Sequence, residues 1–542
     1  MNYMELLGAL APEAIVVLTA LVALAVDLLV LRQAPQNARQ VVAVSITAVG
    51  ILAAIIALSV AAPSPPWMDG LLINHSTTAF LKQTLLVLAL VAGILSIQSR
   101  FTQHTGEYVT LLLLSTVGMM LLVSSDNLLL MFVALELTSL PLYVLTAFNK
   151  ESPSSSEASL KYFLIGSLSA ACLLFGISLL YGLSGGITWT QLATTLRAGS
   201  EPIVYLALIL TLIGFAFKVA AAPFHLWAPD VYQGAPTPVA AFIASGSKIA
   251  SFYMFARIFM AALPGTAGSA AWSGATPGWV PLVAALAVVS MILGNVAAIA
   301  QRSVKRLLAY SAIGHAGYAL LAILSNTEQG MGSLLYYVVT YAVTAMGAFA
   351  VVNVIERDVQ APNGESLTDF AGLSRRSPLL SLCLLVFVLS LAGIPPLAGF
   401  FGKFYIFIAT AQSGTSQGLI WLVMLAIGTS AISLYYYLQI LKQVYVVESV
   451  GQPTPVQLRP AESACIVAMA CTVLILGCAP NWLINRFSPN STEVRRAGVI
   501  TKPSTTLELA AEIHPRITAP LGTATGLVQK RPQFETTTAN AQ

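Results

Sequence analysis

Long apolar runs separated by short polar turns fill the chain from about residue 10 to residue 484. A membrane-spanning helix needs about 20 mainly apolar residues, and that length predicts about fourteen spans here. They lie near residues 10–31, 40–62, 78–98, 108–124, 126–148, 160–183, 202–223, 237–262, 279–299, 305–324, 332–355, 378–411, 418–446 and 461–484. The pattern therefore predicts an all-α polytopic membrane protein.

The stretches between the predicted spans are rich in Pro, Gly, Ser and charged residues. Residues 62–70, 149–157 and 356–370 are predicted to be loops for this reason. Residues 187–197 are too short to span and are expected to lie along the membrane surface. The polar tail 487–542 is rich in Ser, Thr and Pro and is predicted to be disordered.

The five predicted spans from 108 to 262 and the five from 279 to 446 follow the same plan. In each set the fourth member, 202–232 or 378–411, is over-long: an unbroken helix would be roughly 46 or 51 Å, against a hydrocarbon core of about 30 Å. Pro and Gly near the middle of each predict two half-helices. Because five is odd, the second set enters from the opposite side, which predicts an inverted repeat with a transport site at its breaks.

This repeat predicts a division of the chain into five parts. They are a three-helix segment 1–100, a first repeat 108–262, a second, inverted repeat 279–446, a last helix 461–484 and the tail 487–542.

Basic residues gather on one predicted face of the membrane. The loops of that face hold thirteen of them: Arg32, Arg39, Arg100, Lys150, Lys161, Arg302, Lys305, Arg306, Arg357, Arg375, Arg376, Lys442 and Arg459. The loops of the other face hold Arg197 alone. Positive loops stay in the cytoplasm, so both termini are predicted on the non-cytoplasmic side, and Lys305 and Arg306 are interpreted as topology anchors.

Composition agrees with a membrane location, because 57% of the residues are hydrophobic and only 9% are charged. A soluble domain has roughly 25% charged residues. The net charge of +4 is spread through loops, which argues against a nucleic-acid partner and leaves the lipid bilayer as the expected surroundings. The N-terminus lacks the basic start and cleavage site of a secretory signal, so the first run is predicted to be a retained span.

No cofactor or metal site is predicted in this chain. The five cysteines lie inside apolar runs and form no Cys-x-x-Cys pair. The sequence has no Gly-x-Gly-x-x-Gly after a strand and no Walker lysine loop, which argues against a bound flavin or nucleotide.

Five ionisable residues are predicted at membrane depth, where a charged group is costly and usually functional. Glu136 and Lys248 lie about ten residues into their spans, and His315 lies as deep in the second repeat as Glu136 in the first. Lys218 and Lys403 stand beside the two breaks. We expect these five to bind and pass protons; the alternative is that each is a structural residue with its hydrogen bonds satisfied in the core.

Four further residues are weaker candidates. His225 lies at the first break, where it is either a bonded structural residue or a proton relay. Glu157 and Lys161 stand four apart on one helix face at a cytoplasmic entrance, as an ordinary surface pair or as a proton-uptake site. Asp27 lies near the cytoplasmic end of the first span and is expected to touch a neighbour.

Five stretches together resemble the antiporter-like membrane subunits of respiratory complex I, and most closely the N type among them. They are LELTSLPLYVL with Glu136, SSEASLKYFLIGS with Lys161, FKVAAAPFHLWAPDVYQGAPTPVAAFIASGSKIA with Lys218 and Lys248, KRLLAYSAIGHAGY with His315, and LAGIPPLAGFFGKFYIF with Lys403. The resemblance covers roughly residues 5 to 485.

The resemblance implies a fourteen-helix subunit of NADH:quinone oxidoreductase in a bacterial inner (plasma) membrane. The implied proton path runs from the cytoplasm through Glu136, Lys218, Lys248 and His315 to an exit at Lys403. Quinone reduction in other subunits would drive it, using NAD(H) or another electron donor, FMN, iron–sulfur clusters and a quinone. The implied neighbours are the antiporter-like subunit M and the small membrane subunits A, J and K.

Two alternatives stay open at this point. A cation/proton antiporter subunit of the Mrp type would explain the inverted repeat and the lysines equally well, and a purely structural subunit is the third possibility. Within the resembled family, L-type members are longer, and M-type members usually carry Glu where this chain has Lys403. The polar tail departs from the family pattern, and its purpose is unassigned.

Overall fold

The computed structural model describes residues 8, 10–60, 64–67, 71–97, 101–196, 202–358, 364–413, 418–448 and 455–487. The predicted disordered tail beyond residue 487 lies outside this part of the chain, as do both chain ends and the basic residues Arg100 and Arg197.

Thirteen helices of the described residues are long and apolar enough to cross a membrane. They are α2 (Ala11–Ala25) with η1 (Val26–Val30), α3 (Gln36–Val60), α4 (Ser76–Ser96), α5 (Thr105–Ser124), α6 (Leu128–Thr146), α7 (Pro153–Ser184), α9 (Pro202–Val219), α11 (Thr237–Ala256) with η2 (Arg257–Ala262), α12 (Trp279–Ile299), α13 (Val304–Leu324), α14 (Glu328–Ile355), α18 (Ile420–Tyr445) and α19 (Pro460–Cys478). The shorter α16 (Pro378–Ala392) and α17 (Ala398–Ala411) together make a further, broken crossing. The predicted all-α membrane fold is confirmed.

Short elements complete the described fold. They are α8 (Trp189–Thr195), α10 (Trp227–Gly234), η3 (Pro264–Thr266), η4 (Leu367–Phe370), α15 (Leu373–Arg376) and α20 (Pro480–Phe487). The span predicted at 461–484 is in fact two helices, because the ring of Pro480 cannot continue the hydrogen-bond ladder of α19. The loop predicted at 62–70 contributes a strand, β1 (Ser64–Trp67), which pairs antiparallel with β2 (Leu72–Asn74).

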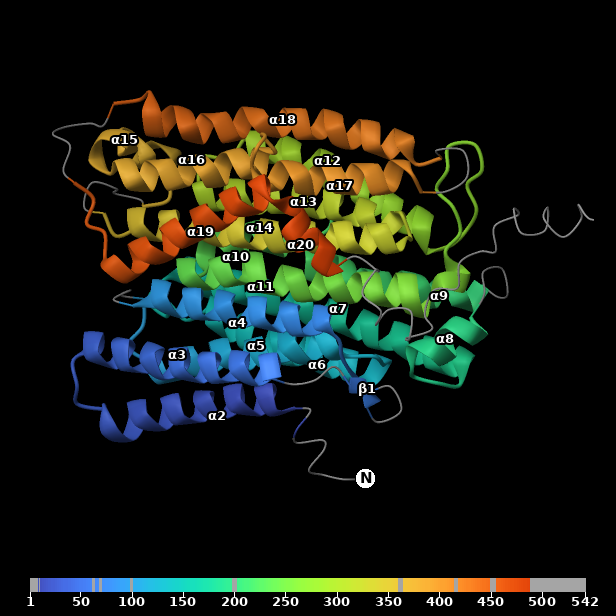
Figure 1. The fold of residues 1–542 in the computed structure, drawn as a ribbon, viewed down its shortest axis with the longest axis horizontal. Coiled ribbons are helices and arrows are strands. Elements are labelled where there is room, and N and C mark those ends of the chain that lie inside the picture. Colours follow the sequence, from blue (N-terminus) through green and yellow to red (C-terminus); the bar gives the residue numbers. More distant parts are fainter. Residues whose placement is uncertain are drawn as a thin grey trace, which may run out of the picture. The chain divides into compact units, whose positions relative to one another are not determined.

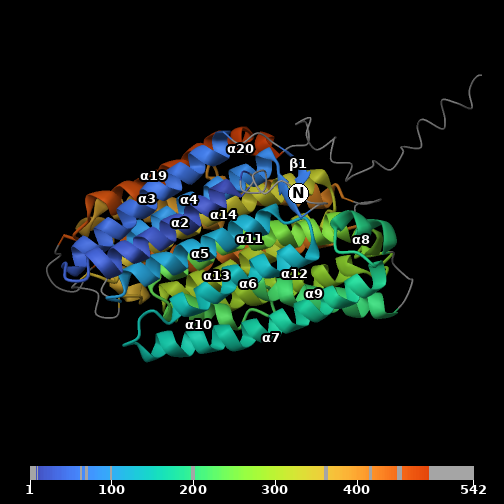
Figure 2. The ribbon, with the colours of Figure 1, turned by 90° about the horizontal axis from the view of Figure 1, so that it is seen from below.

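The helices lie side by side in one bundle, and the same order of elements occurs in it twice (Figures 1 and 2). The first series is α5, α6, α7, α9 with α10, and α11; the second is α12, α13, α14, α16 with α17, and α18. In the first series α5 packs against α6, and in the second α12 packs against α13. Across the two series α11 packs against α14.

Three helices occupy the interior of the bundle. The most apolar windows of α11, α13 and α14 are 100%, 94% and 89% buried, whereas that of α18 is only 39% buried. A helix buried on every face contacts protein rather than lipid, so its polar side chains can be satisfied by other helices. The interior helices are therefore where this fold can hold ionisable groups away from the hydrocarbon.

Both predicted broken helices are present, and both first halves end in the same way. After α9, Ala220 has φ 56°, and the N–H of Ala221 donates to the carbonyl of Ala216. After α16, Gly393 has φ 86°, and the N–H of Ile394 donates to the carbonyl of Leu389. A left-handed residue followed by this six-residue hydrogen bond is a standard helix end.

Prolines follow each of these helix ends, so neither helix resumes at once. Pro223 separates α9 from α10, and Pro395 with Pro396 separates α16 from α17. The first break is also tied to the second series, because the N–H of Ala222 donates to Oγ of Ser290 on α12 (2.8 Å).

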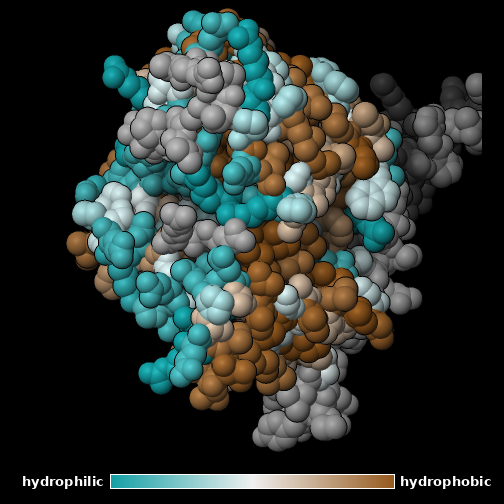
Figure 3. Space-filling model, turned by 90° about the vertical axis from the view of Figure 1, so that its left-hand side faces the viewer, coloured by the Kyte–Doolittle hydropathy of each residue, from teal (hydrophilic) through white to brown (hydrophobic). Residues whose placement is uncertain are grey.

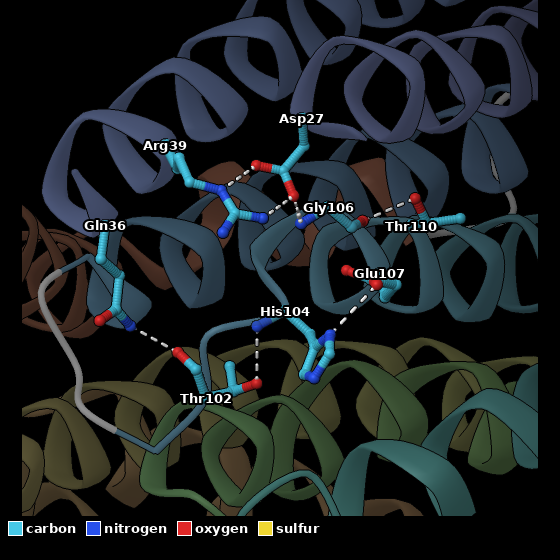
Figure 4. A network of polar contacts seen from close by, with 8 residues as sticks. All are labelled: Asp27, Gln36, Arg39, Thr102, His104, Gly106, Glu107 and Thr110. Carbon is cyan, nitrogen blue, oxygen red and sulfur yellow. Dashed lines mark hydrogen bonds and ion pairs between the residues drawn. The ribbon is translucent and has the colours of Figure 1, made fainter. Parts of the chain in front are cut away.

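A buried ion pair ties the N-terminal helices to α5 (Figure 4). Asp27 at the end of the first span receives two hydrogen bonds from Arg39 on α3, at 2.7 and 2.6 Å, and one from the N–H of Gly106 on α5 at 2.9 Å. A side chain at Gly106 would not fit, because its Cβ would lie 2.8 Å from Cβ of Asp27. Asp27 thus touches a neighbour, in a contact that joins three helices.

Charged residues lie at both ends of the bundle. Figure 3 looks at the end that carries α15, with Arg375 and Arg376, and hydrophilic residues gather along one side of this face. At the other end, Asp126 in the turn between α5 and α6 forms an ion pair with Arg257. Burial raises the pKa of Asp126, although the charge of Arg257 acts in the opposite direction.

Candidate functional site

The five ionisable residues predicted at depth lie on five helices of the bundle. Glu136 is on α6, Lys218 on α9, Lys248 on α11, His315 on α13 and Lys403 on α17. Glu136 is partly buried, and the other four are less than a tenth exposed. Charged groups so deep in a membrane protein require a partner or a polar cavity.

The carboxylate of Glu136 and the ammonium of Lys218 form an ion pair beside the first break, with Oε1 and Nζ 3.7 Å apart. Lys218 also donates a hydrogen bond to Oγ of Ser139, one turn after Glu136 on α6. The ring of Phe217 lies 5.5 Å from the ammonium. The structure thus brings together two residues whose distance the sequence did not give.

The ammonium of Lys248 donates to the carbonyl oxygen of Val219, the last residue of α9. The last carbonyls of a helix lack partners within the helix and form the negative end of its dipole. The break in α9 therefore supplies the acceptor for Lys248. In the described residues, Lys248 has no carboxylate within ion-pair distance.

His315 has a hydrogen bond at each ring nitrogen. Nδ1 lies 2.6 Å from the hydroxyl of Tyr337 on α14, and Nε2 lies 3.0 Å from the hydroxyl of Tyr437 on α18. The charges of Lys248 and Lys403 are near enough to act on the imidazole electrostatically. His315 therefore lies within electrostatic reach of both lysines.

Lys403 sits on the broken end of α16. Its ammonium donates to the carbonyls of Leu391 (3.2 Å) and Ala392 (3.0 Å) and to Oγ of Ser430 on α18 (2.8 Å). The ring of Tyr318 lies 5.1 Å from the same nitrogen. The sequence interpretation matched Lys403 with Lys218, but in its contacts with a helix end Lys403 resembles Lys248.

Glu157 and Lys161 belong to a larger charged cluster. Lys161 bridges Glu157 (2.7 Å) and Asp230 (2.8 Å), and Arg306 binds the other oxygen of Asp230 (2.7 Å). These residues line a cavity of about 390 Å³, together with Gln233. The sequence interpretation missed Asp230, whose place in the long motif was a usable signal, and it took Arg306 for an anchor.

A second polar cavity, of about 290 Å³, lies beside the first. Lys305 forms an ion pair there with Glu356 at the end of α14, and the hydroxyl of Thr237 donates to the same carboxylate. Lys305 is only 5% exposed, so its ammonium is held inside the bundle by this ion pair.

His225 is not joined to the other candidates. It lies in the first break and is 5% exposed, and its Nδ1 has no hydrogen-bond partner in the part of the chain that the structure describes. Among these described residues, no group of three or more His, Cys, Asp or Glu side chains is arranged to hold a metal ion.

Comparison with known proteins decides the family. The family described as "NADH:quinone oxidoreductase/Mrp antiporter, TM" matches residues 125–433, which include all five deep residues. A relative named NADH-quinone oxidoreductase subunit N 2, from Acidobacterium capsulatum, is 49% identical over 89% of this chain and 98% of its own length. The chain belongs to the NADH:quinone oxidoreductase/Mrp antiporter family.

Sequence identity to solved structures, rather than the fold itself, distinguishes the two branches of this family. A chain of respiratory complex I from Thermus thermophilus, solved with bound aureothin, is 35% identical and has a TM-score of 0.72 over 88% of this chain and 99% of its own. A chain of the Mrp complex from Dietzia sp. has a TM-score of 0.75 over 89% of this chain and 99% of its own, at only 19% identity. The Mrp chain shows the fold alone, whereas the sequence relationships favour the NADH-quinone oxidoreductase branch.

Proposed function

We propose that the chain is the N-type antiporter-like membrane subunit of a NADH:quinone oxidoreductase and moves protons from the cytoplasm to the opposite side. The observation that carries this proposal is the set of deep ionisable groups at the two helix breaks: Lys218 pairs with Glu136 beside the first, and Lys248 and Lys403 rest on backbone carbonyls of the two helix ends. The path begins at the Lys161 and Asp230 cavity and continues through Glu136 with Lys218. It then follows Lys248 and His315 to Lys403.

The contacts support a stepwise transfer. Groups that interact strongly titrate as a set, so a proton bound at one changes the proton affinity of the next. Lys218 can give its proton up while Glu136 remains to receive another, and the carbonyls of each broken helix can hold an ammonium without binding it as tightly as a carboxylate would. The two repeats, 108–262 and 279–446, would each contribute one half of the route.

The electron chemistry belongs to other subunits in this proposal. NAD(H) or another donor, FMN, iron–sulfur clusters and a quinone would act there, and this chain would supply only the membrane path. Subunit M and the small membrane subunits A, J and K are the proposed neighbours. The chain would lie in the inner (plasma) membrane of a bacterium with both termini outside the cytoplasm, as the basic loops favour.

The test is proton pumping in inverted membrane vesicles that carry Lys218→Ala, with quinone reduction followed in the same sample. Both rates should fall by about tenfold or more in a fully assembled complex, because proton transfer by a positioned group contributes at least that much. Lys150→Ala is the matched control, since Lys150 is an exposed lysine of the loop between α6 and α7. Parent rates in the Lys218 vesicles would contradict the proposed path.

An Mrp-type cation/proton antiporter subunit shares the fold and is the second candidate. Purification from the native membrane in mild detergent separates the two. Recovery with quinone oxidoreductase subunits supports the first proposal, and recovery in a complex without them supports the second.

A further inference from the structure

An unbroken chain of hydrogen bonds crosses the second repeat through His315. The hydroxyl of Ser311 bonds the hydroxyl of Tyr437, which bonds Nε2 of the imidazole, and Nδ1 bonds the hydroxyl of Tyr337. All four side chains are buried, at 6% exposure or less. They come from α13, α18 and α14, so tertiary packing alone brings them together.

The imidazole gives this chain a direction. A neutral histidine carries one N–H donor and one nitrogen acceptor, whereas a tyrosine hydroxyl can both donate and accept. With hydroxyls at both nitrogens, one tyrosine must donate to the ring and the other must accept from it. Two arrangements with opposite direction therefore fit the same heavy-atom positions.

We propose that Tyr437 and Tyr337 are relay residues that carry the proton into and out of His315. This inference rests on the proposed function. A proton that arrives at the hydroxyl of Tyr437 displaces the hydroxyl's own proton onto Nε2. The proton on Nδ1 then leaves to the hydroxyl of Tyr337, which releases its own proton onward.

Each transfer breaks one O–H or N–H bond and forms one, so a single proton passes and no group keeps a charge. After the transfer, the hydrogen bonds of this chain run in the opposite donor-to-acceptor direction. Rotation of the hydroxyls and reorientation of the imidazole must reset it before the next proton can pass in the same direction.

Tyr337 packs against the helix that carries Lys403. A Cβ at Gly402, the residue before Lys403, would come within 2.8 Å of Cδ2 and 3.5 Å of Cα of Tyr337. Gly402 thus leaves room for the base of the Tyr337 side chain between α14 and α17. In this proposal the proton released at the hydroxyl passes on to Lys403.

The chain itself provides a matched control, because Tyr337 has a tyrosine neighbour on the same helix. The hydroxyl of Tyr336 donates to the carbonyl of Leu476 (2.9 Å). Tyr336 is as deeply buried as Tyr337. Removing either of these two hydroxyls deletes one buried oxygen and leaves one buried partner unpaired, whereas removing the hydroxyl of Tyr437 takes a partner from both Ser311 and His315.

The experiment compares Tyr337→Phe and Tyr437→Phe with the control Tyr336→Phe in assembled complex. Proton pumping and quinone reduction are measured in inverted vesicles, in water and in D₂O. Loss of a relay hydroxyl should lower both rates about tenfold and enlarge the solvent isotope effect, because proton transfer becomes rate-limiting. The control variant Tyr336→Phe should stay within about twofold of the parent, with the parent's isotope effect, because this hydroxyl bonds a backbone carbonyl outside the relay.

Equal loss in all three variants, or parent rates in Tyr337→Phe and Tyr437→Phe, would overturn the relay. Lys218→Ala measured in the same preparation tells the two failures apart. If that variant pumps normally, the proposed function itself is wrong. If it does not pump while both relay variants do, only the relay is wrong. Should one relay variant fail to assemble, the other carries the test.

Discussion

The two broken helices hold their lysines by different means. At the first break, Lys218 faces a carboxylate, Glu136, at 3.7 Å. At the second break, Lys403 faces two backbone carbonyls and a serine, and among the described residues it has no carboxylate within ion-pair distance. The helices α9 and α16 end with the same backbone hydrogen-bond pattern, but the lysines beside the two breaks have different electrostatic partners.

The difference indicates separate roles for the two breaks. An ion pair can gain or lose a proton on either partner, so the first break suits proton loading from the charged cavity that holds Lys161 and Asp230. An ammonium held only by neutral dipoles in the interior is less strongly stabilised, which suits release. Lys248, which rests on a carbonyl of the first break, shares the setting of Lys403 rather than that of Lys218.

The largest expected effect comes from Lys403→Met, which tests the release role of the second break. Proton pumping and quinone reduction should both fall by about tenfold or more, because among the described residues no other ammonium rests on the end of α16. Met keeps much of the side-chain volume and leaves no unpaired charge, so the complex should assemble. Parent pumping rates in assembled Lys403→Met complex would remove the distinction between the two breaks.

Glu136→Gln tests the ion pair at the first break, because it removes the negative charge of the carboxylate and keeps the shape of the side chain. We expect about a fivefold loss of pumping, smaller than for Lys403, since Ser139 still accepts a hydrogen bond from Lys218. Asp27→Asn is the matched control, because it neutralises a buried, paired carboxylate outside the path. Asp27→Asn should reduce the heat stability of the complex but leave the number of protons pumped per quinone reduced unchanged. A lower ratio in Asp27→Asn would show that pumping depends on any buried ion pair and not on Glu136 in particular.

Asp230→Asn should have the smallest effect, about a two- to threefold loss of pumping at low proton concentration. Lys161 keeps Glu157 as a partner, and a partly exposed cavity can take up protons at more than one group. The loss should shrink as the cytoplasmic pH is lowered, since uptake then ceases to limit the rate. A loss as large as that of Lys403→Met at every pH would place Asp230 in the central path instead.

The hydropathy of the sequence was sufficient to predict the membrane fold. The spans, the over-long segments and their prolines are confirmed, because each depends on transfer free energy and backbone chemistry within a single stretch of chain. The errors of the prediction from hydropathy were also confined to single stretches of the chain. Pro480 divides the last predicted span, and the segment around Ser64 pairs as a strand within a predicted loop.

The sequence also marked Glu136, Lys218, Lys248, His315 and Lys403, because an ionisable residue inside an apolar run is conspicuous without any structure. What surrounds them was decided by tertiary packing. Hydropathy carries no information on which helices are in contact. The contact of Tyr437 with His315, the contact of Lys248 with the end of α9 and the burial of Lys305 could therefore not be predicted from the sequence. Such contacts depend on how helices far apart in sequence pack together, and that packing exists only in the folded bundle.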